Sequence, residues 1–136
     1  VDTDLLIEKK YKATLEEIKT ENGYKFVRAA EEEVILSLNE ATKIISTGGS
    51  AVYSKKSMEH LKSFSNIIYI ETALETIINR INVGQERGLA VPDGLTVPEI
   101  YAEREPLYNQ YSDFILDGSK SVKELTKSIQ DDFFNS

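Results

Sequence analysis

The stretch Ile45-Ser46-Thr47-Gly48-Gly49-Ser50-Ala51-Val52 decides the fold of this chain, because a β-branched run stops abruptly at two adjacent glycines. The run is typical of a strand, and the glycine pair allows a ligand to approach the backbone closely, since neither residue carries a Cβ atom. In open α/β sheets, ligands bind at the carboxyl ends of the strands, where this turn would lie. Together with aspartates and arginines elsewhere in the sequence, the turn indicates a site for a polar, anionic small molecule.

Predicted helices and strands alternate on both sides of this turn. Helical patterns mark seven segments, and short apolar or β-branched runs mark three strands. The predicted helices cover residues 5–12, 14–22, 24–40, 56–64, 73–82, 98–111 and 122–134, and the predicted strands cover 43–46, 66–70 and 113–116. Because alternating strands and helices form parallel sheets with helices on both faces, we expect an α/β fold in a single domain, residues 1–136.

The composition of the chain argues against several classes of function. The chain has 136 residues and a formal net charge of −7, so we expect no nucleic-acid partner, since such proteins carry a basic face. It contains no cysteine, which excludes disulfides and thiolate metal sites and favours a reducing, cytoplasmic location. No apolar run approaches the ~20 residues that span a bilayer, so no membrane partner is expected.

One segment, residues 83–98, has little periodicity and is rich in glycine and proline. Loops of this length inside compact domains are often functional, so we expect a lid over a binding site. Pro98 suits the first turn of the helix predicted to follow, because proline has no N–H group to pair there.

Five features occur in a fixed order along the chain. They are Asp2-Thr3-Asp4, Gly23-x-x-x-x-Arg28-x-x-Glu31, Thr47-Gly48-Gly49-Ser50-Ala51-Val52, Arg87 in the expected lid, and Arg104-Glu105-Pro106-Leu107-Tyr108. In this order they resemble the shikimate kinase family over essentially the whole chain. The resemblance implies a three-layer P-loop kinase-type fold with a parallel sheet, in which the substrate-binding region is about 2–50.

The same resemblance implies an activity and its partners. Shikimate kinases transfer the γ-phosphate of ATP to the 3-hydroxyl of shikimate, a step toward the aromatic amino acids. ATP and Mg²⁺ are therefore the expected cofactors, shikimate is the expected small-molecule substrate, and a monomer is the expected state.

The start of the sequence departs from the family pattern. In the family, a strand, a phosphate-binding Gly-x-x-x-x-Gly-Lys-Ser/Thr loop and a helix precede Asp-Thr-Asp, whereas this sequence contains no such loop. The loop supplies the backbone N–H groups and the lysine that hold the phosphates of ATP. We therefore expect that the first strand and the P-loop are absent from this chain as a fragment, and that these residues alone bind ATP weakly or not at all and are inactive.

Two aspartates near Val1 receive roles from the resemblance. Asp4 is expected to bind the hydroxyls of shikimate and to orient the attacked 3-hydroxyl, as a substrate-binding and catalytic residue. Asp2 is expected to face Mg²⁺ through water. From the residues alone, both aspartates also suit the N-terminal cap of the helix predicted from Leu5.

The resemblance also implies how the substrate carboxylate is held. Arg28 and Arg104 are expected to bind that carboxylate, with Glu31 holding the Arg28 guanidinium in place. The backbone of Gly48 and Gly49 is expected to donate to shikimate. A bland alternative is that an Arg–Glu pair three residues apart on a helix is an ordinary surface ion pair.

Two further arginines are expected on the nucleotide side. Arg87 is expected to reach the transferring phosphate when the lid closes, which makes it both a catalytic and a cofactor-binding residue. Arg80 is expected to lie against the adenine, although an arginine near the end of a helix also complements the helix dipole.

Three positions depart from the family pattern and keep other functions open. Tyr24 and Val27 stand where the family usually has glutamate and phenylalanine, and Ser50 replaces the commoner third glycine. The alternatives are a kinase of the same fold that phosphorylates another sugar acid such as gluconate, and a non-catalytic remnant that keeps only the acid-binding pocket.

Overall fold

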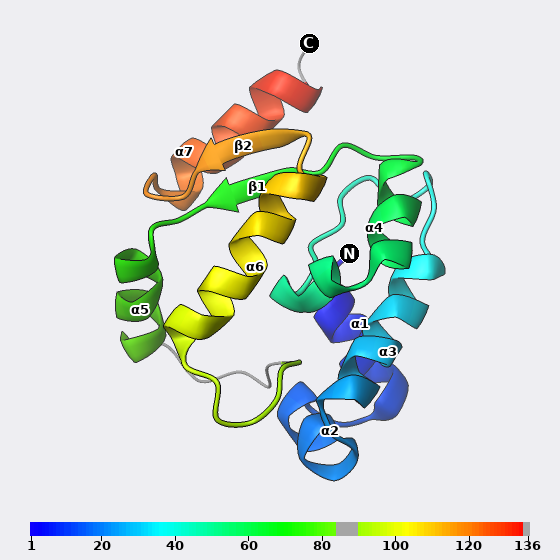
Figure 1. The fold of residues 1–136 in the computed structure, drawn as a ribbon. Helices are drawn as coiled ribbons and strands as arrows, with labels where there is room; N and C mark the ends of the chain where they lie inside the picture. The colour runs from blue at the N-terminus through cyan, green and yellow to red at the C-terminus, as the bar shows by residue number, and fades with distance from the viewer. Residues whose placement is uncertain (84–89, 135–136) are drawn as a thin grey trace.

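The computed structural model of this chain describes residues 1–83 and 90–134, and its arrangement is shown in Figure 1. Three helices precede the glycine turn, and each of the two short strands further along the chain lies between helices, as the sequence predicts. In chain order the elements are α1 (Thr3–Tyr11), α2 (Leu15–Asn22), α3 (Tyr24–Leu36), the 3-10 helix η1 (Gly49–Tyr53), α4 (Lys55–Lys62), β1 (Ile68–Glu71), α5 (Leu74–Val83), α6 (Val97–Tyr111), β2 (Phe114–Asp117), α7 (Val122–Ile129) and the π-helical turn η2 (Gln130–Phe134).

The strands pair in parallel, as expected for this class. β1 and β2 form a two-stranded sheet in the register Ile68↔Phe114 to Glu71↔Asp117. A second parallel contact joins Asp2 to Ser46 as an isolated bridge. The prediction of an α/β fold with parallel strands is confirmed.

The strand predicted over 43–46 is reduced to that single bridge. Ser46 donates its N–H to Val1 O at 2.7 Å and accepts the Thr3 N–H at 2.9 Å. The segment is extended, but the only neighbour it pairs with among the described residues is the three-residue N-terminal stretch that enters α1. A longer ladder therefore has no partner on which to form.

Helix α3 ends at Leu36, four residues before its predicted end. Ser37 Oγ donates to Val34 O at 2.6 Å, and Asn39 Oδ1 accepts the Ala41 N–H at 2.9 Å. Such local side-chain bonds offer the backbone an alternative to the helix, so polar residues of this kind favour turns.

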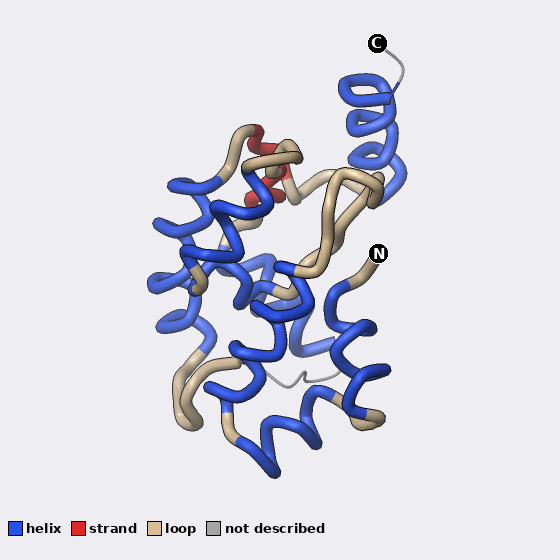
Figure 2. The backbone as a smooth tube through the Cα atoms, turned by 90° about the vertical axis from the view of Figure 1, so that its right-hand side faces the viewer, coloured by secondary structure: helices blue, strands red, loops and turns tan. Residues whose placement is uncertain are grey.

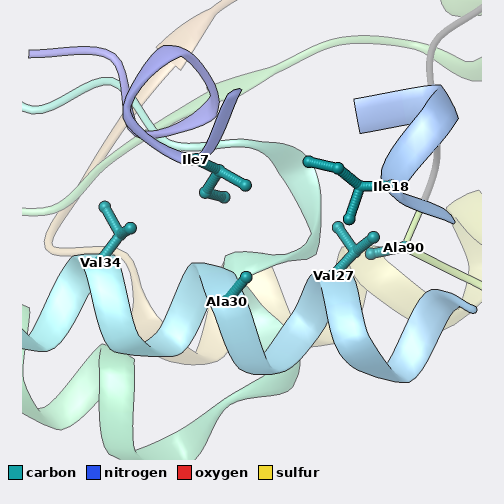
Figure 3. Packing of buried hydrophobic residues seen from close by; sticks show 6 residues of the cluster. All are labelled: Ile7, Ile18, Val27, Ala30, Val34 and Ala90. Atoms are coloured by element: carbon teal, nitrogen blue, oxygen red, sulfur yellow. The ribbon is translucent and has the colours of Figure 1, made fainter. Parts of the chain in front are cut away.

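Two apolar clusters hold the helices together. The first joins α1, α2 and α3 and is shown in Figure 3; it comprises Ile7, Ile18, Val27, Ala30, Val34 and Ala90. The second fixes η1 and α4 against α3 and comprises Ile35, Ala51, Val52, Met58 and Leu61. These clusters position the ends of α1, α3 and η1 on which the candidate site is built.

The C-terminal part is packed less closely. Figure 2 shows the C-terminal helix standing apart from the helices around the glycine turn. It touches β2 through the Phe114 and Phe133 rings, whose centroids lie 5.0 Å apart. An open groove of about 780 Å³ lies between the Ile44–Thr47 segment and β1, and its walls are mainly apolar. No described helix is both long enough and apolar enough to cross a membrane.

Candidate functional site

The glycine pair is the point on which the candidate site converges. A Cβ atom at Gly48 would lie 2.7 Å from Asp4 Oδ1 and 2.9 Å from Glu31 Oε2. One at Gly49 would lie 2.6 Å from Arg104 Nη1 and 3.0 Å from the Tyr108 hydroxyl. A side chain at either position would meet the ends of site side chains, which would have to shift, so glycine is favoured at both positions by close approach and not by backbone conformation.

A cavity of about 180 Å³ lies beside this turn. Its lining residues are Asp4, Ile7, Leu15, Val27, Glu31, Thr47, Gly48, Gly49, Ser50, Ala90 and Arg104. The volume is below the roughly 300–1,000 Å³ typical of sites for drug-sized ligands, so it suits a single small ring. The walls combine apolar side chains with two carboxyl groups and one guanidinium.

Asp4 reaches the cavity from the first turn of α1. Asp2 precedes that helix as its N-cap, and its carboxylate accepts the Asp4 N–H at 2.9 Å. The capping role considered for both aspartates from sequence therefore falls to Asp2. Asp4 is left with its carboxylate directed at the glycine turn, where a bound polyol could meet it.

Glu31 is the buried acid of the site, with only 3 % of its surface exposed. It comes from the middle of α3 and accepts a hydrogen bond from Ser50 Oγ at 2.8 Å. Burial is the main cause that raises the pKa of Glu31, and the Asp4 charge adds to it; Ser50, Arg104 and Arg28 oppose the shift, and the pKa comes to about 7. Glu31 thus changes its charge near neutral pH.

Arg28 is held differently from the expectation. It forms no ion pair with Glu31 within the described residues, and its Nε–H donates instead to Ala90 O at 2.7 Å. Its guanidinium carbon lies 3.9 Å from the centre of the Tyr53 ring and 4.9 Å from that of Tyr24. The expected Arg28–Glu31 ion pair is wrong: Glu31 accepts from Ser50, and Arg28 acts on it only as a nearby charge.

Arg104 enters the site from α6. That helix begins at a capping box formed by Thr96 and Glu99, with Pro98 in its first turn, as the sequence indicated. Arg104 Nε donates to the Tyr53 hydroxyl at 3.3 Å. One turn later, the Tyr108 hydroxyl donates to Gly49 O at 2.7 Å. Burial raises the pKa of Tyr108, so its hydroxyl keeps the proton that makes this bond.

The structure therefore brings together four of the predicted residues, Asp4, Gly48, Gly49 and Arg104, around one cavity. Arg28 lies at its edge, joined to the lining residue Ala90 but not itself lining the cavity. Asp2 lies one helical turn away as a cap.

Arg80, expected on the nucleotide side, does not line this cavity. Arg80 lies at the end of α5, where its Nη2 donates to Gly118 O at 3.0 Å. Arg87 and most of the first half of the predicted lid lie outside the described residues. Within residues 1–83 and 90–134, no cluster of three or more histidine or acidic side chains is arranged to hold a metal ion.

Sequence reasoning missed the importance of one residue, Tyr53. It ends η1, four positions after Gly49, and contacts both Arg28 and Arg104. The sequence gives no signal of this role, because Tyr53 stands in an ordinary apolar run. The two arginines that it contacts, Arg28 and Arg104, are 76 positions apart in the chain. Only the packing of α3 against α6 through η1 reveals it.

Comparisons with known proteins show which family the chain resembles. The family model described as shikimate kinase matches residues 1–133. The chain is 34% identical over 136 residues to a shikimate kinase of Histophilus somni (strain 2336), covering 96% of this chain and 78% of that protein. It is 25% identical over 134 residues to shikimate kinase 2 of Enterobacter sp. (strain 638), covering 95% and 77%.

Solved structures show the same likeness. The crystal structure of shikimate kinase from Aquifex aeolicus superimposes with a TM-score of 0.76 at 25% identity, covering 94% of this chain and 76% of that one. Shikimate kinase from Acinetobacter baumannii in complex with shikimate superimposes with a TM-score of 0.77 at 24% identity, covering 99% and 78%, which supports the fold.

Proposed function

The chain belongs to the shikimate kinase family, and on that premise we propose that its cavity beside Gly48 binds shikimate as the acceptor of a phosphoryl group. The family is one of ATP-dependent kinases, so the reaction is phosphoryl transfer to an alcohol. The observation that carries the proposal is the convergence of Asp4, Glu31 and Arg104 on the two glycines.

Asp4 is proposed to bind and orient the acceptor hydroxyl. Its carboxylate borders the cavity at Gly48, where it can accept hydrogen bonds from the hydroxyl groups of a ring. Phosphoryl transfer depends mainly on positioning the nucleophilic oxygen and on neutralising charge, and a carboxylate facing that oxygen can also take its proton. The glycines contribute by allowing the ring to lie against the backbone.

Arg104 and Arg28 are proposed to bind the carboxylate of the substrate. Arg104 lines the cavity directly, and Arg28 lies at its edge with only its Nε–H engaged by an acceptor among the described residues. A guanidinium carries five N–H donors in a plane and matches a carboxylate with two parallel hydrogen bonds. Two arginines at one side would fix the acid end and leave the hydroxyls facing Asp4.

For the nucleotide side, we propose the roles that the family suggests. Arg80 and Arg87 would contact ATP, and Asp2 would face Mg²⁺ through water. Mg²⁺ is usually held by one or two carboxylates together with substrate phosphates, so a single exposed aspartate fits this mode without a protein cage. When bound, the ion would neutralise phosphate charge. We also propose that the protein acts in the cytoplasm as a monomer and that residues 83–98 form a lid.

Calorimetric titration of the chain with shikimate, gluconate and ATP tests the proposal. We expect shikimate to bind, gluconate to bind at least tenfold more weakly, and ATP to bind weakly or not at all. Asp4→Asn should abolish or strongly weaken shikimate binding, while Asp132→Asn, an exposed change in η2, should leave it unchanged. Absence of shikimate binding, or equal binding by the Asp4 variant, would contradict the proposal.

A further inference from the structure

Tyr53 occupies a position that no role in the proposed reaction explains. It is the last residue of η1, the short helix that begins at Gly49, and it is half-buried between α3 and α6. Its ring face carries the Arg28 guanidinium, with the guanidinium carbon 3.9 Å from the ring centre. Its hydroxyl accepts the Nε–H of Arg104 at 3.3 Å.

Both contacts use parts of the arginines that a carboxylate does not need. Stacking engages the flat face of the Arg28 guanidinium and leaves the N–H groups at its edge available. The bond to the Tyr53 hydroxyl takes the Nε–H of Arg104 and leaves the terminal nitrogens, of which Nη1 lies close to Gly49. Tyr53 thus restricts two cations without occupying their full set of donors.

Tyr53 also offsets the repulsion between the positive charges of Arg28 and Arg104, which lie close together. Arg28 and Arg104 both approach the same ring, and the negative face of an aromatic ring attracts cations. Burial raises the pKa of Tyr53, so its hydroxyl stays neutral and can accept from Arg104. Glu31, which could have neutralised Arg28, is bonded to Ser50 instead.

We propose that Tyr53 is a positioning residue that fixes Arg28 and Arg104 as a paired binding site for the carboxylate of the acceptor. This inference rests on the proposed function, because it assigns the acid end of the same substrate. Tyr24 is a second aromatic neighbour of Arg28, with its ring centre 4.9 Å from the guanidinium carbon.

The test compares two variants that remove the contacts one at a time. Tyr53→Phe keeps the ring under Arg28 and removes the hydroxyl, which accepts from Arg104 and also bonds Glu103, whereas Tyr53→Leu removes the ring as well. Tyr101→Leu on α6 is the matched control, since Tyr101 contacts Glu105 and lies on no arginine among the described residues. Each protein is titrated by calorimetry with shikimate and with its methyl ester, which lacks the carboxylate charge.

We expect Tyr53→Leu to weaken shikimate binding by about tenfold or more and Tyr53→Phe by about threefold, which are the sizes of a lost cation–π contact and of one hydrogen bond. Binding of the methyl ester should change by less than twofold in both, and Tyr101→Leu should bind both ligands like the wild type. A thermal melt shows whether each variant is folded.

The outcomes separate this inference from the proposed function. If the wild type binds shikimate and Tyr53→Leu binds it equally well, or loses shikimate and the methyl ester to the same extent, the role of Tyr53 is wrong and the proposed function stands. Should Tyr53→Leu prove unfolded, unchanged shikimate affinity in Tyr53→Phe overturns the inference in the same way. If the wild type binds neither ligand, the proposed function fails and this inference fails with it.

Discussion

The helical half around the glycine turn and the half formed by β1, β2 and α7 differ sharply in how their side chains are buried. The first contains both apolar clusters and the buried Glu31. In the second, Ile115 and Val122 are 51 % and 81 % exposed, and α7 has no buried residue. A two-stranded sheet with little cover is marginal by itself, because it has too little apolar surface to bury. The candidate cavity therefore lies in the more closely packed half, and α6 joins it to the sheet through the ring contact of Tyr108 with Tyr69.

The largest expected contrast between the halves is in the cost of removing an apolar side chain. Ile7 is fully buried in the first cluster, so Ile7→Ala should lower the free energy of unfolding by about 2–5 kcal/mol through lost burial and a residual cavity. Val122→Ala on the exposed face of α7 should change it by less than about 0.5 kcal/mol. Urea denaturation followed by circular dichroism measures both values. Equal costs at the two positions would contradict the contrast.

The next expected effect is a change of stability with pH, which Glu31 beside the cavity causes. The pKa of Glu31 is raised from 4.5 to about 7, so between these values the folded state keeps a proton that the unfolded state has lost. Stability therefore falls as pH rises through this window, by about 3 kcal/mol in total, and levels off above pH 7. Glu31→Gln removes this titration and retains an acceptor for Ser50.

Urea denaturation of the wild type and of Glu31→Gln at several pH values tests this dependence. The stability of the wild type relative to the variant should decline from pH 4.5 to about 7 and stay constant beyond. Asp113 provides a control in the sheet half: its pKa is lowered by the Ile67 N–H, so Asp113→Asn should alter the profile only at acidic pH. A constant difference between wild type and Glu31→Gln would refute the account of Glu31.

The smallest of the three stability effects expected around the cavity is at the glycine turn. In Gly48→Ala the added methyl group would meet the Asp4 and Glu31 carboxyl oxygens, which must shift. We expect a loss of about 1–3 kcal/mol in stability, typical of overpacking, together with loss of shikimate binding. Thermal denaturation and calorimetry measure the two effects. Retention of wild-type affinity would show that the carboxyl groups can move without harm to the site.

The sequence predicted the boundaries of some elements more accurately than those of others. Helix starts were predicted to within one residue at 14 and 98, where the structure has local caps at Thr14 and Thr96, each with a partner three residues along the chain. The extended run before Gly48 was predicted as a strand, yet it forms one bridge only, since pairing depends on a neighbour that no local pattern reveals. Boundaries set by tertiary contacts were therefore less accurate than those set by caps.

The same distinction holds in the candidate site. The ordered motifs anticipated that Asp4, Gly48 and Arg104 would meet, because their order matched a known family. They did not indicate that Glu31 would accept a hydrogen bond from Ser50, or that the neighbour of Arg28 would be Tyr53. Partner choice among buried polar groups depends on distances of tenths of an ångström, which spacing along a chain does not encode.

The close approach at the glycine pair also bears on how this sequence can diverge. At positions 48 and 49, atoms of the binding site lie too close to the place that a Cβ atom would occupy. Ser50, the next residue, has accepted a side chain and uses it to bond a buried acid. A side chain at position 48 or 49 would therefore displace groups of the binding site, whereas the side chain at position 50 adds a contact to it.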